Sequence, residues 1–191
     1  AGRATYPNGD VYEGDFVNGL REGSKGTYTH AVPTAEDGTK PPAEVYDGPW
    51  VNNLKEGIGK QNYPGLGHYN GYWLAGDKHG EGVMIYENGD IYSGNWKASK
   101  KDGKVTYVFA KTGMKFIGTF RGGEIVQGKW FYPNGSCFDG KFQGNQPKGD
   151  GKWCFSNGNV VEGVYTQTKK VDGAGDEVKL AWKTTSDITA Q

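Results

Sequence analysis

The sequence contains no long apolar run and few residues that bind metals or form disulfides. No stretch of the 191 residues approaches the roughly 18 apolar residues that a membrane-spanning helix needs. Two cysteines are too few for a disulfide framework and are typical of a reducing compartment. The three histidines, His30, His68 and His79, lie far apart without partners at metal-ligand spacing. We therefore expect no metal site.

The chain also has no excess of positive or negative charge. The 22 Lys and Arg residues balance 22 Asp and Glu residues, which argues against nucleic acid or an anionic membrane as the main partner. No Ser-His-Asp arrangement, activated cysteine or paired carboxylates can be defended from spacing. We therefore expect no enzyme activity, no catalytic residue and no cofactor.

Two short motifs resemble functional sites but have simpler explanations. Residues Gly123 to Lys129 have the outline of a phosphate-binding loop, but Trp130 stands where Ser or Thr should coordinate magnesium, and a strand rather than a helix is expected to follow. Asn134-Gly135-Ser136 is formally a glycosylation sequon, yet the same residues have the composition of a turn. We predict structural roles for both.

Glycines and aromatic residues dominate instead, and they recur as a Tyr-x-Gly-x-Trp/Phe motif. The motif glycines are spaced by 34, 23, 23, 24, 22 and 23 residues, which is the signature of a repeat protein. These glycines are Gly14, Gly48, Gly71, Gly94, Gly118, Gly140 and Gly163. The aromatic pairs that flank the first six are Tyr12 and Phe16, Tyr46 and Trp50, Tyr69 and Trp73, Tyr92 and Trp96, Phe116 and Phe120, and Phe138 and Phe142.

One repeat has the pattern of a β-hairpin. Residues two apart in a strand share a face, so Tyr69, Gly71 and Trp73 project to one side and the glycine leaves a gap between the rings. The following segment, Gly80 to Tyr86, alternates in the same way and should form the returning strand. The fold class predicted is all-β: an elongated, twisted, single-layer antiparallel sheet built from such hairpins.

Asn-Gly pairs mark the turns between repeats. The number of residues in each turn follows from the alternation of side chains between the two faces of the sheet. A three-residue loop with Gly89 in a left-handed bulge position keeps the aromatic residues of successive repeats on one face, whereas a two-residue loop would not. This register places Tyr92, Gly94 and Trp96 opposite Met84, Gly82 and Gly80. Glycine is therefore predicted to face glycine.

The run from Tyr69 to Gly82 closely resembles the MORN repeat (membrane occupation and recognition nexus), with Tyr-x-Gly-x-Trp followed by Gly and His-Gly-x-Gly. The resemblance covers about Gly2 to Tyr165, or six full units with partial ones at each end. Three units depart from the pattern: the first has an extra residue between Gly23 and Gly26, Val105 replaces the final glycine of the fourth, and Gly128 of the fifth is displaced by one.

Two later segments, 111–120 and 140–152, are similar to the MORN-type radial spoke head proteins, which are structural subunits of motile cilia and flagella. That resemblance implies a scaffold in the axoneme, within the cytoplasm and cytoskeleton, that binds other radial spoke head proteins and contacts the central pair apparatus. It implies support of ciliary motility. The balanced charge predicts no nucleic acid partner and disfavours a membrane. Self-association or a dimer of heads stays open.

Two other functions, which the resemblance to MORN-repeat proteins also implies, stay open. One is a MORN scaffold associated with membranes or phospholipids, which the absence of a basic cluster disfavours. The other is a non-catalytic regulatory region of a larger enzyme. The aromatic face itself has two alternatives, because its rings can pack on themselves through twist and curvature or be reserved for a partner.

The predicted organisation has two parts. Residues 1–165 form the repeat array, with a partial repeat at 1–9, full repeats from residue 10 and a protruding insert loop at 30–44, and residues 166–191 form a C-terminal cap and tail. The chain begins midway through a repeat, so we expect an upstream segment. The array supplies the platform, and we expect specific function where the pattern breaks: the insert, the shifted fifth repeat and the fading C-terminus.

Pairing Gly140 with Gly151 places Cys137 and Cys154 opposite each other on the face that carries no aromatic row. We expect two free thiols rather than a disulfide, because the compartment is reducing and directly cross-strand disulfides are often strained.

Overall fold

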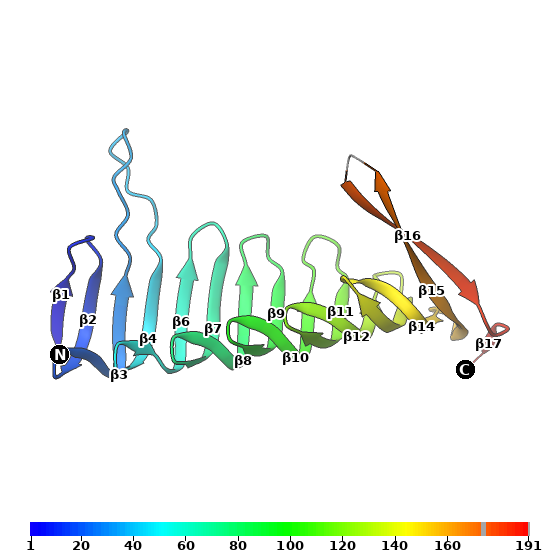
Figure 1. The fold of residues 1–191 in the computed structure, drawn as a ribbon, viewed down its shortest axis with the longest axis horizontal. Helices are drawn as coiled ribbons and strands as arrows, with labels where there is room; N and C mark the ends of the chain where they lie inside the picture. Colours follow the sequence, from blue (N-terminus) through cyan, green and yellow to red (C-terminus); the bar gives the residue numbers. More distant parts are fainter. Residues whose placement is uncertain (173–174, 191) are drawn as a thin grey trace. The chain divides into compact units, whose positions relative to one another are not determined.

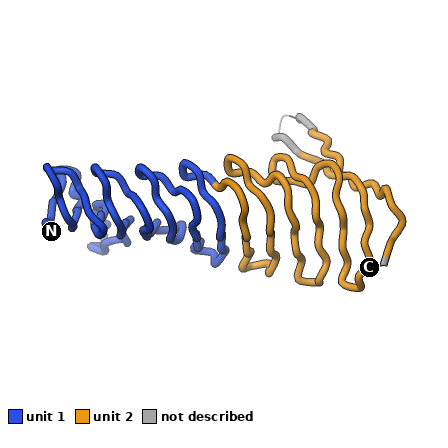
Figure 2. Tube along the Cα trace, turned by 90° about the horizontal axis from the view of Figure 1, so that it is seen from below, with its two compact units in different colours: residues 1–100 blue, residues 101–191 orange. Residues whose placement is uncertain are grey.

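The computed structural model describes residues 1–172 and 175–190. The chain divides into two compact units, residues 1–100 and 101–191 (Figure 2). Both units are all-β, and none of the described residues is helical. The predicted fold class is therefore confirmed: the strands form antiparallel hairpins that follow one another along each unit as a single layer (Figure 1).

The strands of the first unit are β1 (Gly2–Thr5), β2 (Val11–Val17), β3 (Leu20–Thr29), β4 (Val45–Val51), β5 (Leu54–Lys55), β6 (Gly57–Tyr63), β7 (Gly67–Leu74), β8 (Asp77–Tyr86) and β9 (Ile91–Lys97). The strands of the second unit are β10 (Lys100–Val108), β11 (Lys115–Arg121), β12 (Glu124–Phe131), β13 (Cys137–Gln143), β14 (Gln146–Cys154), β15 (Asn159–Asp172), β16 (Gly175–Thr184) and β17 (Thr189–Ala190). The first residue of β10, Lys100, is the last residue of the first unit.

Glycine faces glycine across most strand pairs, as the register prediction requires. In β8 and β9, Gly82 lies opposite Gly94, Met84 opposite Tyr92 and Gly80 opposite Trp96. The same pairing continues through Gly2–Gly14, Gly14–Gly26, Gly26–Gly48, Gly59–Gly71 and Gly71–Gly82 in the first unit, and through Gly118–Gly128, Gly128–Gly140, Gly140–Gly151 and Gly151–Gly163 in the second.

The turn between β8 and β9 is the predicted three-residue loop. The amide of Gly89 donates to the carbonyl of Tyr86 at 2.9 Å, the amide of Tyr86 donates to the carbonyl of Asp90 at 2.9 Å, and Gly89 has φ +86°. The side-chain oxygen of Asn88 accepts the Asp90 amide at 3.0 Å, which explains the preference for asparagine before the glycine. Equivalent turns have glycines with φ of +86°, +82° and +86° at Gly9, Gly135 and Gly158.

Turns inside a repeat are shorter and have two residues. Asn18 and Gly19 connect β2 to β3, and Ala75 and Gly76 connect β7 to β8, all four with positive φ as in a type I′ turn. A bulge follows each such turn and bends the strands, so that the turn ends of the hairpins curl back (Figure 1). The irregular first and fifth repeats differ from the third and sixth in this bulge.

The bulges absorb the irregular spacings seen in the sequence. Between Gly71 and Trp73, the first strand advances two residues while its partner advances four, from Gly82 to Lys78. In the fifth repeat, Thr119 to Phe120 is one step while Gln127 to Ile125 is two, so the bulge has one extra residue instead of two. The glycine register beyond the bulge is thereby kept.

Residues 30–44 contain no strand and protrude between β3 and β4 beyond the neighbouring turns (Figure 1). The amide of His30 donates to the carbonyl of Glu44 at 2.9 Å and closes the base of the loop. Near the tip, the amide of Ala35 donates to the carbonyl of Thr39 at 2.8 Å. The insert therefore leaves the pairing of β3 with β4 intact.

The C-terminal strands change the pattern. Gly163 faces Thr184 instead of a glycine, and the Trp182 ring lies against it, since a Cβ atom on Gly163 would be 2.4 Å from that ring. β15 extends beyond its pairing with β14 to form a ribbon with β16, and β17 pairs with the start of β15. Residues 173, 174 and 191 of the predicted C-terminal cap and tail lie outside the described residues.

The turn between β8 and β9 gives a first prediction. Replacing Gly89 by Ala should lower the free energy of unfolding by about 1–2 kcal/mol, because an L-residue is strained in the left-handed conformation. Replacing Glu87 by Ala in the same turn is the matched control and should change stability by no more than about 0.5 kcal/mol. Denaturant unfolding followed by tryptophan fluorescence measures both, and equal losses would contradict the proposed turn.

Candidate interaction surfaces

Each regular repeat buries one ring over a pair of facing glycines. A Cβ atom on Gly82 would lie 2.3 Å from the hydroxyl oxygen of Tyr69, and one on Gly71 would lie 2.4 Å from it. Neither glycine has a positive φ, so the ring rather than backbone strain excludes a larger side chain. The same contact is made by Tyr12, Tyr46, Phe116 and Phe138.

The rings predicted for the repeat core lie on this inner face. Eleven of the twelve are at most 8% exposed, while Phe16 is 37% exposed. Tyr69 meets Trp73 edge to face at 5.2 Å and Trp96 at 5.4 Å, so a tyrosine contacts the tryptophan of its own repeat and that of the next. These motif rings therefore pack on one another, and all but Phe16 expose little surface.

The polar atoms of these rings are satisfied by backbone carbonyls. The Tyr69 hydroxyl donates to the carbonyl of Tyr72 at 3.0 Å, and the Trp73 indole donates to the carbonyl of Gly59 at 3.2 Å. Tyr12 and Tyr46 make the same tyrosine bond, three residues ahead, and Trp50 and Trp96 make the same indole bond. These bonds fix the orientation of each ring over its glycines.

A row of cations lies among the rings, and the sequence analysis missed it. The charged group of Arg21 is 4.3 Å from the centre of the Trp50 ring, that of Lys55 is 4.9 Å from Trp73, and that of Lys78 is 5.1 Å from Trp96. The signal was present: a cation follows each of the first four motif glycines by seven residues, at Arg21, Lys55, Lys78 and Lys101, and Ile125 and Pro147 take that place in the next two repeats.

Partial burial disfavours the charged form of these lysines, and the Lys55 ammonium has a side-chain acceptor. Loss of hydration lowers the pKa of both Lys55 and Lys78 below the ordinary value. The Lys55 ammonium donates to the side-chain oxygen of Gln61, which is fully buried, and the amide of Gln61 donates to Glu44 at 2.7 Å. The last residue of the insert is thus tied to the core of the second repeat.

The other side of the insert is held by Asp10. Its carboxylate accepts the Ala31 amide at 2.7 Å and the Tyr28 hydroxyl at 2.7 Å, and it lies 3.3 Å from Nδ1 of His30. The Ala31 amide, more than the Tyr28 hydroxyl, holds the pKa of Asp10 below its ordinary value. Burial and the Asp10 contact raise the pKa of Tyr28 to about 12. The loop base is therefore positioned from both sides.

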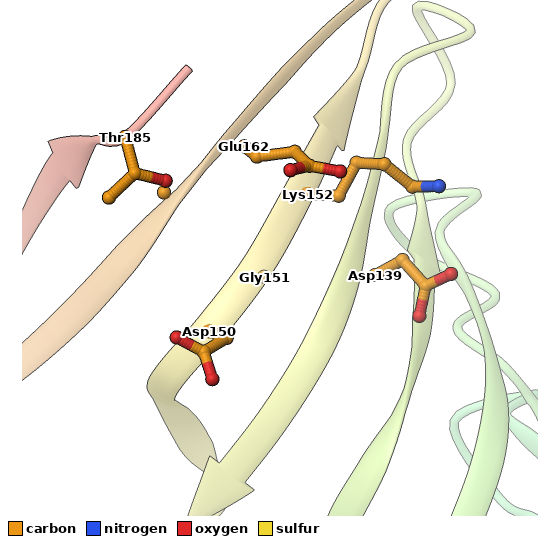
Figure 3. Close-up of a pocket in the computed structure, with 7 residues that line it drawn as sticks. Asp139, Asp150, Gly151, Lys152, Glu162 and Thr185 are labelled. Atoms are coloured by element: carbon orange, nitrogen blue, oxygen red, sulfur yellow. The ribbon is translucent and has the colours of Figure 1, made fainter.

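The outer face of the second unit carries opposite charges on successive strands. Asp139 of β13 faces Lys152 of β14, which faces Glu162 of β15, and these side chains form a row in Figure 3. On the other side of Asp139, the ammonium of Lys129 lies 3.7 Å from its carboxylate. Such cross-strand pairs stabilise a solvated sheet face.

Two adjoining hollows open on this outer face. One of about 350 Å³ is lined by Asp139, Asp150, Lys152, Glu162 and Thr185 together with Gly151 and Gly163 (Figure 3). A second of about 350 Å³ shares Asp139 and Asp150 and extends over the fifth repeat, where Thr119 and Gln127 line it. The hollows lie where the repeat pattern shifts and where it fades.

Two further hollows also adjoin breaks in the pattern. In the second unit, a hollow of about 340 Å³ lies among rings of the inner face, beside Ile125 at the position where other repeats have a cation. In the first unit, a hollow of about 440 Å³ lies between the turn at Pro64, the turn residue Glu87 and Pro42 of the insert. Residues of the insert and of the irregular fifth repeat thus line part of these hollows.

The two short motifs that resemble functional sites are parts of the repeat structure. Residues 124–129, from the segment that resembles a phosphate-binding loop, belong to β12, and Asn134-Gly135-Ser136 form an inter-repeat turn, as predicted. No group of three or more His, Cys, Asp or Glu side chains in residues 1–172 and 175–190 could hold a metal ion. Over the same residues, no helix has the length and apolar character needed to cross a bilayer. Cys137 and Cys154 face each other and are both free thiols.

These features define a repeat protein made of hairpins with glycine-seated rings. A family model for the MORN repeat matches residues 12–31, 46–65, 69–91, 92–114 and 138–160, which is more than half of the chain. The chain belongs to the MORN-repeat family. The matches leave out residues 115–137, where the fifth repeat has its shortened bulge, although the glycine pairing continues there.

Other comparisons add little. No curated protein matches the chain. Among solved structures, the chain is similar to the SAS-4 (dCPAP) TCP domain in complex with a proline-rich motif of Ana2 (dSTIL) of Drosophila melanogaster, at 19% identity over 68% of each chain and a TM-score of 0.41. A TM-score of this size carries no argument about function.

The ring seat gives a second prediction. Replacing Gly82 by Ala should lower the free energy of unfolding by about 1–3 kcal/mol, because the new methyl group must displace the Tyr69 ring. Replacing the neighbouring exposed Glu81 by Ala is the control and should cost less than about 0.5 kcal/mol. In a double-mutant cycle with Tyr69→Leu, the loss from Gly82→Ala should shrink. Strict additivity would show that the ring is not the cause.

The base of the insert gives a prediction on pH. Asp10→Asn should lower the free energy of unfolding by about 1 kcal/mol at pH 7, because hydrogen bonds to a charged acceptor are stronger than those to a neutral one. Since the folded-state pKa of Asp10 is lowered, its contribution is fully present above about pH 4 and is lost as the pH falls through the folded value. Denaturation at pH 7 and pH 3 measures the difference between the two chains, and a difference independent of pH would contradict this role.

Proposed function

We propose that this chain is a non-catalytic scaffold that holds partner proteins on its outer face and at the irregular hollows. One observation carries the proposal: the rings of the inner face are consumed in the core, with eleven of twelve at most 8% exposed. A partner would then engage side chains of the outer face, the insert or the hollows. MORN repeats imply an interaction or scaffold role of this kind, and proteins with these repeats are generally not catalytic.

The finer proposal is a subunit of the radial spoke head in the axoneme of motile cilia and flagella. It is supported by the sequence similarity of segments 111–120 and 140–152 to MORN-type spoke head proteins. Its partners would be other spoke head proteins and the central pair apparatus. Hairpins joined laterally by backbone hydrogen bonds resist shear, which suits a subunit that transfers load between moving assemblies.

The test is native purification of the tagged full chain from ciliated cells, followed by identification of its companions. Other spoke head subunits are expected. Recovery with membrane proteins from outside the cilium would overturn the spoke head assignment, and recovery with a catalytic subunit would favour a regulatory region of an enzyme. Flotation with acidic liposomes tests the membrane alternative, and strong salt-sensitive binding would favour it.

A pair of charge reversals tests whether the outer hollow holds the partner. Asp150 lines both hollows of the second unit and is exposed, whereas Glu81 is an exposed acid on a regular repeat of the first unit. Asp150→Lys should reduce recovery of the companions at least about tenfold, which corresponds to roughly 1.4 kcal/mol of binding free energy. Glu81→Lys should leave recovery unchanged. Equal recovery with both variants would place the partner elsewhere.

A further inference from the structure

Cys137 and Cys154 are the two cysteines of the chain, and they lie directly opposite each other on β13 and β14. Residues directly opposite in an antiparallel pair have Cα atoms about 4.5 or 5.5 Å apart, depending on their hydrogen-bonding position. Disulfides span Cα separations of about 4.4–6.8 Å. The register therefore brings the two thiols within bonding reach without moving either strand.

The surroundings favour reaction between the two thiols rather than with other molecules. Cys137 is 8% exposed and Cys154 is half-buried, and the register places the two residues directly opposite each other. Phe131 lies opposite Cys137 on one side, and Val160 lies opposite Cys154 on the other. Apolar residues thus flank the pair along the sheet, and solvent reaches it mainly at Cys154.

We propose that Cys137 and Cys154 form a thiol modification site, which a peroxide oxidant converts into a reversible disulfide joining β13 to β14. The resting state is the free dithiol that the structure shows. The modified state keeps the strand register and adds one covalent bond across it. Directly cross-strand disulfides are often strained, and strained disulfides are the readily reduced ones, so thiol reductants should restore the resting state.

The chemistry balances with hydrogen peroxide as the oxidant. The Cys154 thiolate attacks one peroxide oxygen and breaks the O–O bond, which gives a sulfenic acid on Cys154 and hydroxide that takes up the thiol proton as water. The Cys137 sulfur then attacks the Cys154 sulfur, the S–O bond breaks, and the oxygen leaves as a second water with the Cys137 proton. Two thiols and one peroxide thus give one disulfide and two waters.

Burial decides which thiol reacts first. Loss of hydration, more than the contact with Cys154, raises the pKa of Cys137 to about 11, so little of its thiolate exists at neutral pH. Cys154 is the more accessible sulfur and should meet the peroxide. Cys137 lies directly opposite Cys154 and acts as the resolving thiol.

The disulfide would lie beside the charged row of the outer face. Cys137 precedes Asp139 by two residues on β13, and Cys154 follows Lys152 by two on β14, so the thiols and the charged pair share one sheet face. A covalent link at this point prevents β13 and β14 from separating next to the hollow lined by Asp139 and Lys152.

The test uses the purified full chain, reduced and then treated with submillimolar hydrogen peroxide at neutral pH. After a quench, alkylation under denaturing conditions and intact mass measurement should show a monomer that is lighter by two hydrogen atoms and takes up no alkyl group. Dithiothreitol should restore both alkylation sites. Two alkyl groups after peroxide treatment, or disulfides joining separate chains, would overturn the proposal.

Single variants test the order of reaction. Cys137→Ala should leave a sulfenic acid on Cys154 that dimedone traps, since the resolving thiol is missing. Cys154→Ala should leave Cys137 as an unmodified thiol under the same conditions, at least about tenfold less labelled. Circular dichroism establishes that each variant is folded. Dimedone labelling of Cys137 but not Cys154 would overturn the assigned roles.

Discussion

The contact on which the rest of this structure depends is that of an aromatic ring with two facing glycines. The ring of Tyr69 occupies the space that Cβ atoms of Gly71 and Gly82 would need. Only glycine permits this approach, and only a register that pairs the glycines provides two adjacent gaps. Because Tyr69 also meets Trp96 of the next repeat, each hairpin completes the core of its neighbour. A single hairpin could bury too little surface to offset its chain entropy.

The polar network on the same face determines how irregular segments attach. Half-buried cations among the rings need acceptors, and Gln61 connects Lys55 to Glu44 at the end of the insert. Asp10 holds the other end through Ala31 and Tyr28. The insert therefore leaves the array from a fixed base, and its position is decided by contacts that are themselves part of the repeat core. The insert, which interrupts the repeat pattern of the sequence, therefore has a defined position on the surface.

The surfaces that do not take part in the core determine where a partner can bind. Rings that satisfy one another and donate to backbone carbonyls have little left for a partner, whereas the outer face presents alternating charges and shallow hollows. The hollows adjoin the insert, the fifth repeat and the C-terminal strands, where a bulge is shortened, a cation is absent or a glycine pair is incomplete. In a repeat protein, such breaks are what distinguishes one member's surface from another's.

The sequence by itself determined the hairpin, the register and the three-residue turn, because strand alternation and the left-handed preference of glycine are local properties. Only the tertiary structure decided that the rings are packed on themselves, that Arg21, Lys55 and Lys78 lie among them, and that the bulges absorb the irregular spacings. A cation seven residues after each early motif glycine is visible in the sequence, but charge alone does not show where the side chain lies. Its burial depends on rings from the neighbouring repeat, which no single segment of sequence contains.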